Sequence, residues 1–175
     1  SASGAGSRNM PQSMDEYLIV DGYNIIGAWP ELKKLKAIRL EEARDRLIEI
    51  LADYQGYSGQ KILLVFDAHQ IPGLGGKYEQ SKLQIYYTKE KETADELIER
   101  LVTQLAGRRK QIYVAMSDLV EQHVIFRLGA LRISARELLV KIRQSQKEVR
   151  SRIEEAALSR DTFDNRLDPK IRELF

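Results

Sequence analysis

Short apolar runs alternate along this chain with longer stretches of helical periodicity, and this alternation constrains the fold more than any other feature. Strands that alternate with helices are joined by crossover connections, which produce a mostly parallel sheet covered on both faces. We therefore predict a three-layer α/β/α domain with a sheet of four to five strands. The predicted strands are Tyr17 to Val20, Lys61 to Phe66, Leu83 to Tyr87, Gln111 to Met116 and, shorter than the others, Leu131 to Ile133.

The helical stretches carry recognisable start and stop signals. Apolar residues recur at helical spacing from Ile38 to Tyr54. Thr93 to Glu96 forms a capping box that opens a second helix, which Gly107 ends. Ser134 to Glu137 is another capping box, and the long helix that follows it is expected to run to about Ala157.

Turns and loops are predicted between these elements. Asp21 and Gly22 are interpreted as a turn after the first strand, and Gly56 to Gln60 as a loop. The segment from His69 to Lys82 contains one proline and three glycines, so we predict a long mobile loop there. A further helix is expected to follow Asp118 and to end near Arg127.

The composition fits a single domain in a reducing compartment. A chain of 175 residues that is 43% hydrophobic can bury one core. The absence of cysteine excludes a disulfide scaffold and a thiolate zinc site. No apolar stretch is long enough to cross a bilayer, and no secretory signal is visible, so we expect a cytoplasmic protein with no membrane partner. The net charge of +2 is too small to indicate nucleic-acid binding by itself.

The chain is expected to divide into three parts. Residues 1–13 are small, polar and patternless, which is typical of a tail added for expression, and Met14 is the expected native start. Residues 14–133 form the predicted α/β core. Residues 134–175 form a basic helical extension that we expect to pack on the same domain.

Aspartates follow the predicted strands where each strand ends. Because the carboxyl ends of parallel strands meet at one edge of a sheet, these side chains are expected to converge. Converging carboxylates repel one another, and a hard cation such as Mg²⁺ or Mn²⁺ relieves that repulsion. Such a metal activates water and stabilises charge on a phosphate under attack. The predicted catalytic and metal-binding aspartates are Asp21, Asp67, Asp95 and Asp118.

Three of these aspartates also have a purely structural interpretation. Asp21 can be a turn residue, Asp95 an acid favoured in the first turn of a helix, and Asp118 a helix cap. Taken singly, each is as easily structural as catalytic, and only their recurrence at successive strand ends favours catalysis. Asn24 is assigned a supporting role in the site, and Glu96 is assigned to the capping box rather than to the metal.

Three groups of basic residues are candidates for binding RNA phosphates, and for the first group a solvated helix face is the equal alternative. The first lies on and just before the long helix, opposite the apolar residues Leu138, Leu139, Ile142 and Val149. The second precedes the strand at Gln111, and the third lies in the loop before Leu83, which we expect near the metal edge. The groups are Arg132, Arg136, Lys141, Arg143, Lys147, Arg150 and Arg152; Arg108, Arg109 and Lys110; and Lys77 and Lys82, with Tyr78 between them.

Three further side chains have both functional and structural interpretations. Trp29 can stack on a base, although a single tryptophan is more often packed in a core. His69 follows Asp67 and can contact a substrate phosphate, but a surface histidine is the preferred interpretation. His123 is interpreted as a packing or surface residue.

Several strings in this chain together resemble the NYN domain group of PIN-like nucleases, and more narrowly its YacP-type bacterial branch. The strings are LIVDGYNIIGAWP, VFDAH, TKEKETADELIE, SDLVEQ and GALRISARELL. The resemblance covers nearly all of Met14 to Phe175, and in that branch a short further basic tail is expected after the last residue. The branch includes a ribosome-associated endonuclease that is thought to cleave mRNA at the A site.

This resemblance implies a PIN-like fold and an endoribonuclease that depends on Mg²⁺ or Mn²⁺. Its expected partners are RNA, specifically mRNA, and the ribosome. Residues 14–133 would be the nuclease core. The resemblance also implies that Asp21, Asp67, Asp95 and Asp118 form the acidic cluster, with Asn24 as a nearby polar partner.

Rival functions fit the residues less well. A phosphohydrolase that forms an aspartyl phosphate needs a second acid two residues after the nucleophile, where this chain has Tyr23. A receiver domain needs paired acids at the end of the first strand, and Asp21 stands alone there. The stronger alternative is a non-catalytic protein that binds RNA or the ribosome through the same fold, and the intact acid set argues against it.

Overall fold

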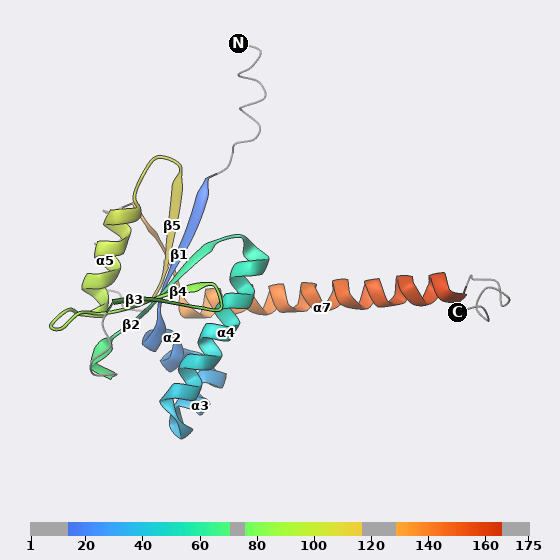
Figure 1. Ribbon diagram of the computed structural model, residues 1–175, viewed down its shortest axis with the longest axis horizontal. Coiled ribbons are helices and arrows are strands. Elements are labelled where there is room, and N and C mark those ends of the chain that lie inside the picture. The colour runs from blue at the N-terminus through green and yellow to red at the C-terminus, as the bar shows by residue number, and fades with distance from the viewer. Residues whose placement is uncertain (1–13, 71–75, 117–128, 166–175) are drawn as a thin grey trace, which may run out of the picture. The chain divides into compact units, whose positions relative to one another are not determined.

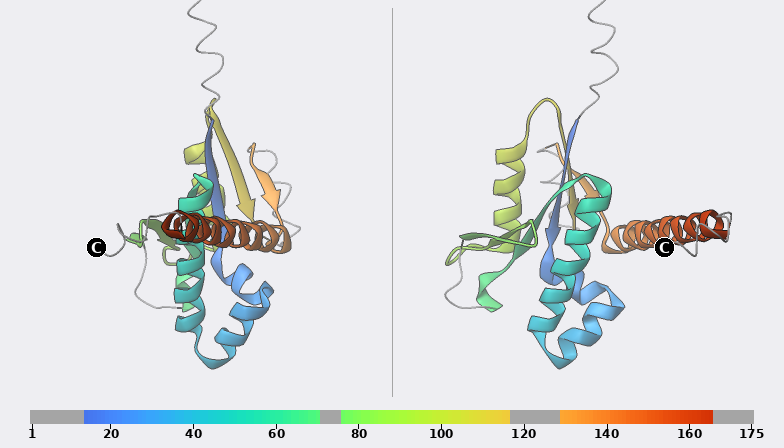
Figure 2. Two further views of the ribbon diagram at one scale, coloured as in Figure 1. Left: turned by 90° about the vertical axis from the view of Figure 1, so that its right-hand side faces the viewer. Right: turned by 45° about the vertical axis from the view of Figure 1, so that its right-hand side comes forward.

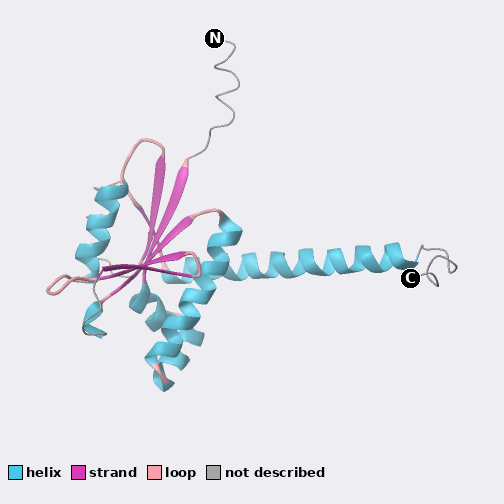
Figure 3. Cartoon of the chain, viewed as in Figure 1, coloured by secondary structure: helices cyan, strands magenta, loops and turns pink. Residues whose placement is uncertain are grey.

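The computed structural model describes residues 14–70, 76–116 and 129–165, and side chains within 14–69, 78–116 and 129–161 (Figures 1 and 3). The strands are β1 Asp15–Asp21, β2 Lys61–Phe66, β3 Gly76–Gln80, β4 Leu83–Tyr87, β5 Lys110–Ala115 and β6 Leu131–Ile133. The helices are α2 Gly22–Ala28, α3 Pro30–Ile38, α4 Leu40–Ser58, the short 3₁₀ helix η1 Ala68–Gln70, α5 Ala94–Leu105 and α7 Ala135–Asn165.

A single mixed sheet organises the described part of the chain. Six strands lie in the order β3-β4-β2-β1-β5-β6. All neighbouring strands are parallel except β3 and β4, which form an antiparallel pair. The prediction of a mostly parallel sheet is confirmed, with one more strand than the four to five expected.

Helices cover both faces of the sheet, as the three-layer prediction requires (Figure 2). On one face, Ile19 and Val65 pack against Leu97 and Leu101 of α5. On the other face lie α2 and α4, which contact β2, while α3 packs against both helices. Strand residues therefore alternate between two buried environments, and all of Leu18, Ile19 and Val20 are at most 1% exposed. A fully buried strand is typical of a parallel sheet between helical layers.

Two capping boxes fix the starts of α5 and α7, and both predictions are confirmed. The Thr93 hydroxyl accepts a hydrogen bond from the Glu96 amide at 3.1 Å, and the Glu96 carboxylate accepts one from the Thr93 amide at 2.9 Å. The same exchange joins Ser134 and Glu137, at 3.0 and 3.3 Å. Each box satisfies amide donors that a helix start otherwise leaves unpaired.

Trp29 is a packing residue. Its side chain is only 2% exposed, and its indole Nε1 donates a hydrogen bond to the carbonyl of Ala135 at 2.8 Å. The indole thereby ties the junction of α2 and α3 to the first residue of α7. The packed interpretation of this tryptophan is confirmed.

The prediction that His69 to Lys82 forms a loop is wrong for part of that segment. Residues Gly76–Gln80 form β3, an edge strand that pairs with β4 through a tight turn. Ser81 and Lys82 adopt positive φ angles of 54° and 67° in that turn. The proline and glycines before β3 led to the prediction of a loop, although five residues there form a strand. This strand is stabilised by pairing with β4 rather than by an alternating hydrophobic pattern in its own sequence.

Two other boundaries differ from the prediction. α2 begins at Gly22 with no intervening turn, so the expected turn after β1 is wrong. The predicted loop from Gly56 to Gln60 is mostly helical, because α4 continues to Ser58 and ends where Gly59 adopts a left-handed φ of 76°. The helix predicted after Asp118 lies outside the described residues.

The described chain forms two compact units, one up to Leu139 and one from Val140 onward. α7 is longer than predicted and reaches Asn165. Of the apolar residues predicted opposite the basic ones, Leu138 and Ile142 are buried, whereas Val149 is 39% exposed. The packing of residues 134–175 as an extension of one domain stays a prediction. None of the described helices combines the length and the apolar character needed to cross a membrane.

Candidate functional site

β1 and β2 are neighbouring parallel strands (Figure 1), and one predicted aspartate stands at the carboxyl end of each. Asp21 is the last residue of β1, and Asp67 directly follows β2. In the parallel register Asp21 pairs with Val65, so Asp67 comes two residues further along the neighbouring strand. Side chains alternate between the faces of a sheet, so this register places both aspartates on one side.

Asp95 reaches the same edge from α5. Because β4 and β5 are both parallel to the central strands, the chain leaves β4 at the carboxyl edge and returns through α5 to the amino end of β5. α5 therefore begins at the carboxyl edge, and Asp95 is its second residue. The face below α5 is also the face of Asp21, since Ile19, two residues earlier, packs in the core with α5.

Neither Asp21 nor Asp95 acts as a helix cap. Asp21 occupies the N-cap position of α2, but its side chain makes no capping hydrogen bond. The cap of α5 consists of Thr93 and Glu96, which leaves Asp95 outside the capping box. Asp21, Asn24 and Asp95 each take part in other interactions. A capping role therefore explains neither carboxylate, although the helix dipole still favours an acid at Asp95.

The Asp67 carboxylate is held by two neighbouring donors. Its Oδ1 accepts a hydrogen bond from the His69 amide at 2.9 Å and one from the Thr88 hydroxyl at 3.4 Å. Thr88 is 1% exposed, and its hydroxyl also accepts a hydrogen bond from the Ala68 amide at 2.8 Å. The Thr88 amide donates to the carbonyl of Phe66 at 3.1 Å. Thr88 thus joins the ends of β2 and β4 and orients Asp67, a role that the sequence analysis missed.

The imidazole of His69 lies beside the same carboxylate. Its Nδ1 is 3.9 Å from Oδ1 of Asp67, and 66% of the side chain is exposed. The surface interpretation of His69 therefore holds, with Asp67 as its neighbour. His123, the other histidine, lies outside the described residues.

Tyr23 and Arg44 border the acidic edge, and the sequence analysis assigned no role to either. Arg44, on α4, donates a hydrogen bond from Nη1 to the Tyr23 hydroxyl at 3.3 Å. Burial raises the pKa of Tyr23, Arg44 opposes this rise, and the negative charge of Asp67 adds to it. The positive charge of Arg44 and the negative charge of Asp67 therefore both act on the Tyr23 hydroxyl, so all three side chains lie near one another.

The metal site itself remains a prediction. Within the described residues, no three side chains of His, Cys, Asp or Glu lie close enough together to hold a metal ion. Asp118, the fourth predicted ligand, lies outside those residues. The structure thus brings Asp21, Asp67 and Asp95 to one edge of the sheet. Among the described residues, these three carboxylates do not lie close enough together to bind one metal ion.

Some of the predicted RNA-binding residues lie at the carboxyl edge of the sheet and others at the amino edge. Arg136 is exposed at the start of α7, which follows the carboxyl end of β6. The backbone of Lys77 pairs with Tyr86, near the carboxyl end of β4. Lys82, in contrast, lies in the turn that precedes β4 at the amino edge, so the expectation that it lies near the metal edge is wrong.

The other basic candidates lie before β5, on β6 and on α7. Arg108 and Arg109 are exposed just before β5, and the Arg109 carbonyl accepts a hydrogen bond from the Asp15 amide at 2.8 Å, which places them at the amino edge. Arg132, on β6, has a buried Nε with no hydrogen-bond partner in the described structure. Arg143 and Lys147 are exposed on α7. RNA binding by all of these residues stays a prediction.

Comparison with known proteins identifies close relatives. A family model described as the YacP-like NYN domain matches residues 18–175 of this chain. A Bacillus subtilis (strain 168) protein named Uncharacterized protein YacP is 50% identical over 138 residues, which make up 79% of this chain and 81% of that protein.

Two solved structures show the same fold. Both are crystal structures of Rae1 (YacP) from Bacillus subtilis, which has a PIN-like fold. One covers 91% of this chain and 91% of its own, with 45% identity and a TM-score of 0.73. The other, of a single-residue mutant, covers 81% of this chain and 84% of its own, with 46% identity and a TM-score of 0.73.

Proposed function

The chain belongs to the YacP-like NYN domain family, and from this premise we propose that it is a metal-dependent endoribonuclease that cleaves mRNA in association with the ribosome, in the cytoplasm. The single observation that carries the proposal is the register of β1 and β2, which brings Asp21 and Asp67 to one face of the carboxyl edge. The proposed metal ligands are Asp21, Asp67, Asp95 and Asp118.

The donor set fits Mg²⁺ or Mn²⁺. All four proposed ligands are carboxylates, and hard divalent cations prefer oxygen ligands. A bound cation of this kind lowers the pKa of its water and stabilises negative charge on a phosphate under in-line attack.

The residues of this chain have distinct proposed roles around that chemistry. Asp67 is held in one orientation by the His69 amide and the Thr88 hydroxyl, so its other oxygen can face the substrate side of the edge. Asn24, which lies on α2 three residues after Asp21, is proposed to orient the attacking water. Arg44 supplies positive charge beside the acidic edge and is proposed to bind the RNA backbone there.

A non-catalytic protein that binds RNA or the ribosome is the alternative function. It is favoured by one observation, namely that no three acidic or histidine side chains in the described structure lie close enough together to hold a metal. The two functions differ in whether the aspartates matter for cleavage or only for the fold.

An RNA cleavage assay separates these functions. The wild-type protein should cleave RNA with Mg²⁺ or Mn²⁺ and lose this activity when the metal is chelated, and the assay is run with and without ribosomes. Asp21→Asn and Asp95→Asn should each abolish cleavage while the far-UV circular dichroism spectrum stays that of the folded wild type, because loss of a metal ligand removes most of the catalysis. Asp53→Asn, an exposed aspartate on α4, is the matched control and should cleave normally.

Two results would contradict the proposal. Cleavage by Asp21→Asn and Asp95→Asn at the wild-type rate would show that these carboxylates are structural. A wild-type protein that binds RNA but cleaves none of it, with or without ribosomes, would establish the binding function instead.

A further inference from the structure

A row of aromatic side chains borders the proposed site, and we infer that it stacks against the bases of single-stranded RNA. Tyr78 and Tyr87 are the proposed base contacts, while Phe66 and Tyr23 support them. The inference rests on the RNA substrate of the proposed function and assigns to that substrate a base-binding subsite beside the acidic edge.

The row crosses neighbouring strands without a break. The Tyr23 and Phe66 rings have centroids 4.9 Å apart, and the Phe66 and Tyr87 rings 5.8 Å apart, with the latter pair stacked. Tyr78 meets Tyr87 edge to face, at 5.3 Å and 80°. The row therefore begins just after β1 and passes over the ends of β2 and β4 to the edge strand β3.

The row lies at the same edge as the aspartates but on the other face of the sheet. Phe66 and Tyr87 are the last residues of β2 and β4, so they end at the carboxyl edge, where Asp67 follows. Alternation puts Tyr87 on the face opposite Tyr86, which packs in the core with α5. Tyr78 pairs with Ile85 and so shares the face of Tyr87. An RNA strand that passes over this edge can thus present a phosphate to the aspartates and a base to the tyrosines.

Part of this row is open to solvent. Tyr78 is 41% exposed, whereas Phe66 is fully buried and Tyr23 and Tyr87 are intermediate. An edge-to-face contact covers at most one of the two faces of a ring, so Tyr87 leaves at least one face of the Tyr78 ring uncovered. Aromatic side chains of this kind stack on bases of any sequence, because every base has a π-face.

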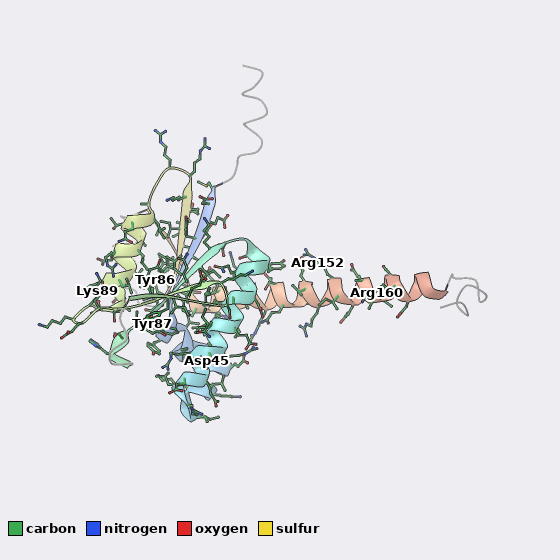
Figure 4. The ribbon with its side chains drawn as sticks, viewed as in Figure 1. Asp45, Tyr86, Tyr87, Lys89, Arg152 and Arg160 are labelled. Atoms are coloured by element: carbon green, nitrogen blue, oxygen red, sulfur yellow. The ribbon has the colours of Figure 1, made fainter. Side chains whose placement is uncertain are left out.

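A positive charge accompanies the row, as a nucleic-acid subsite requires. Arg44 donates to the Tyr23 hydroxyl, and its charge also opposes the rise that burial causes in the pKa of Tyr87. Within the described residues Arg44 forms no close ion pair with a carboxylate. Asp45, the neighbour of Arg44 on α4 (Figure 4), raises the pKa of Tyr87, but by less than Arg44 lowers it.

The inference is tested by RNA binding in the presence of a chelator, which removes metal and therefore cleavage. The probe is a short fluorescent single-stranded RNA, compared with an abasic strand of the same length that keeps every phosphate. Fluorescence anisotropy gives the dissociation constant of each. Tyr78→Ala should weaken binding of the RNA by about 5- to 140-fold, the range expected for one lost stack. The same change should leave binding of the abasic strand unaltered.

Two variants serve as controls. Tyr78→Phe keeps the ring and should bind RNA like the wild type. Tyr57→Ala removes a tyrosine of similar exposure, 38%, from the last turn of α4 at the amino edge, and it should bind like the wild type as well.

Equal effects of Tyr78→Ala on both strands, no effect on either, or a wild-type protein that does not prefer RNA to the abasic strand would each overturn the inference. Its failure is distinguishable from that of the proposed function, which is measured as cleavage with metal. Binding that depends on Tyr78 without cleavage supports the subsite and contradicts the nuclease. Cleavage without this dependence contradicts only the subsite.

Discussion

The packing around Gly22, next to the proposed site, leaves room for no residue larger than glycine. A Cβ atom at this position would lie 2.9 Å from the carbonyl oxygen of Val65 and would clash with the Phe66 ring. The sequence analysis interpreted Gly22 as part of a turn, but the structure shows that it lets the start of α2 approach β2. The partners of Tyr23, Arg44 and Thr88 were unpredictable for the same reason, because they depend on how α4 and β4 pack rather than on any local pattern.

Gly22→Ala should therefore destabilise the protein by about 1–3 kcal/mol, the usual cost of overpacking a close contact. Urea denaturation measures the change in the free energy of unfolding. Gly27→Ala is the matched control, since a Cβ at this position in α2 meets nothing within 4 Å. Alanine there should be neutral or stabilising, because it is the better helix former. Equal effects of the two substitutions would contradict the packing argument.

Elements with strong local signals are the ones that the sequence predicts well. β2 and β4 have the predicted bounds, and both capping boxes form as expected. β3 was missed because an edge strand is defined by the strand it pairs with, and its own residues follow a proline and several glycines. α7 was predicted too short because its exposed second half lacks the apolar periodicity from which a helix end is judged.

The exposed basic face of α7 is expected to contribute to RNA or ribosome binding. Arg143→Glu combined with Lys147→Glu should weaken this binding and lower the slope of log affinity against log salt by roughly 2, because two phosphate contacts no longer release counterions. The swap Arg143→Lys with Lys147→Arg keeps both charges and should leave the slope unchanged. If the charge-reversed variant has the same slope as the wild type, the prediction is contradicted and this face of α7 is merely a solvated surface.

At the scale of the whole molecule, topology brings residues that are distant in sequence to one edge of the sheet. Asp21, Asp67 and Asp95 were predicted to meet there because a parallel sheet gathers its carboxyl ends, and the strand order satisfies that condition. The aromatic row could not be predicted in this way, because Tyr78 joins it through β3, which the sequence analysis did not find. The central claim is that these carboxylates form one metal site.

The melting temperature with and without metal tests this claim most directly, because it needs no substrate. At a concentration a hundredfold above its dissociation constant, Mg²⁺ or Mn²⁺ should stabilise the native state by about 2.7 kcal/mol, or roughly 5–11 °C. Asp21→Asn and Asp118→Asn should each raise the melting temperature of the metal-free protein, because one repelling charge is removed, and should shrink the gain from metal. Asp53→Asn should respond to metal like the wild type. A wild-type melting temperature that millimolar Mg²⁺ and Mn²⁺ leave unchanged would contradict the account.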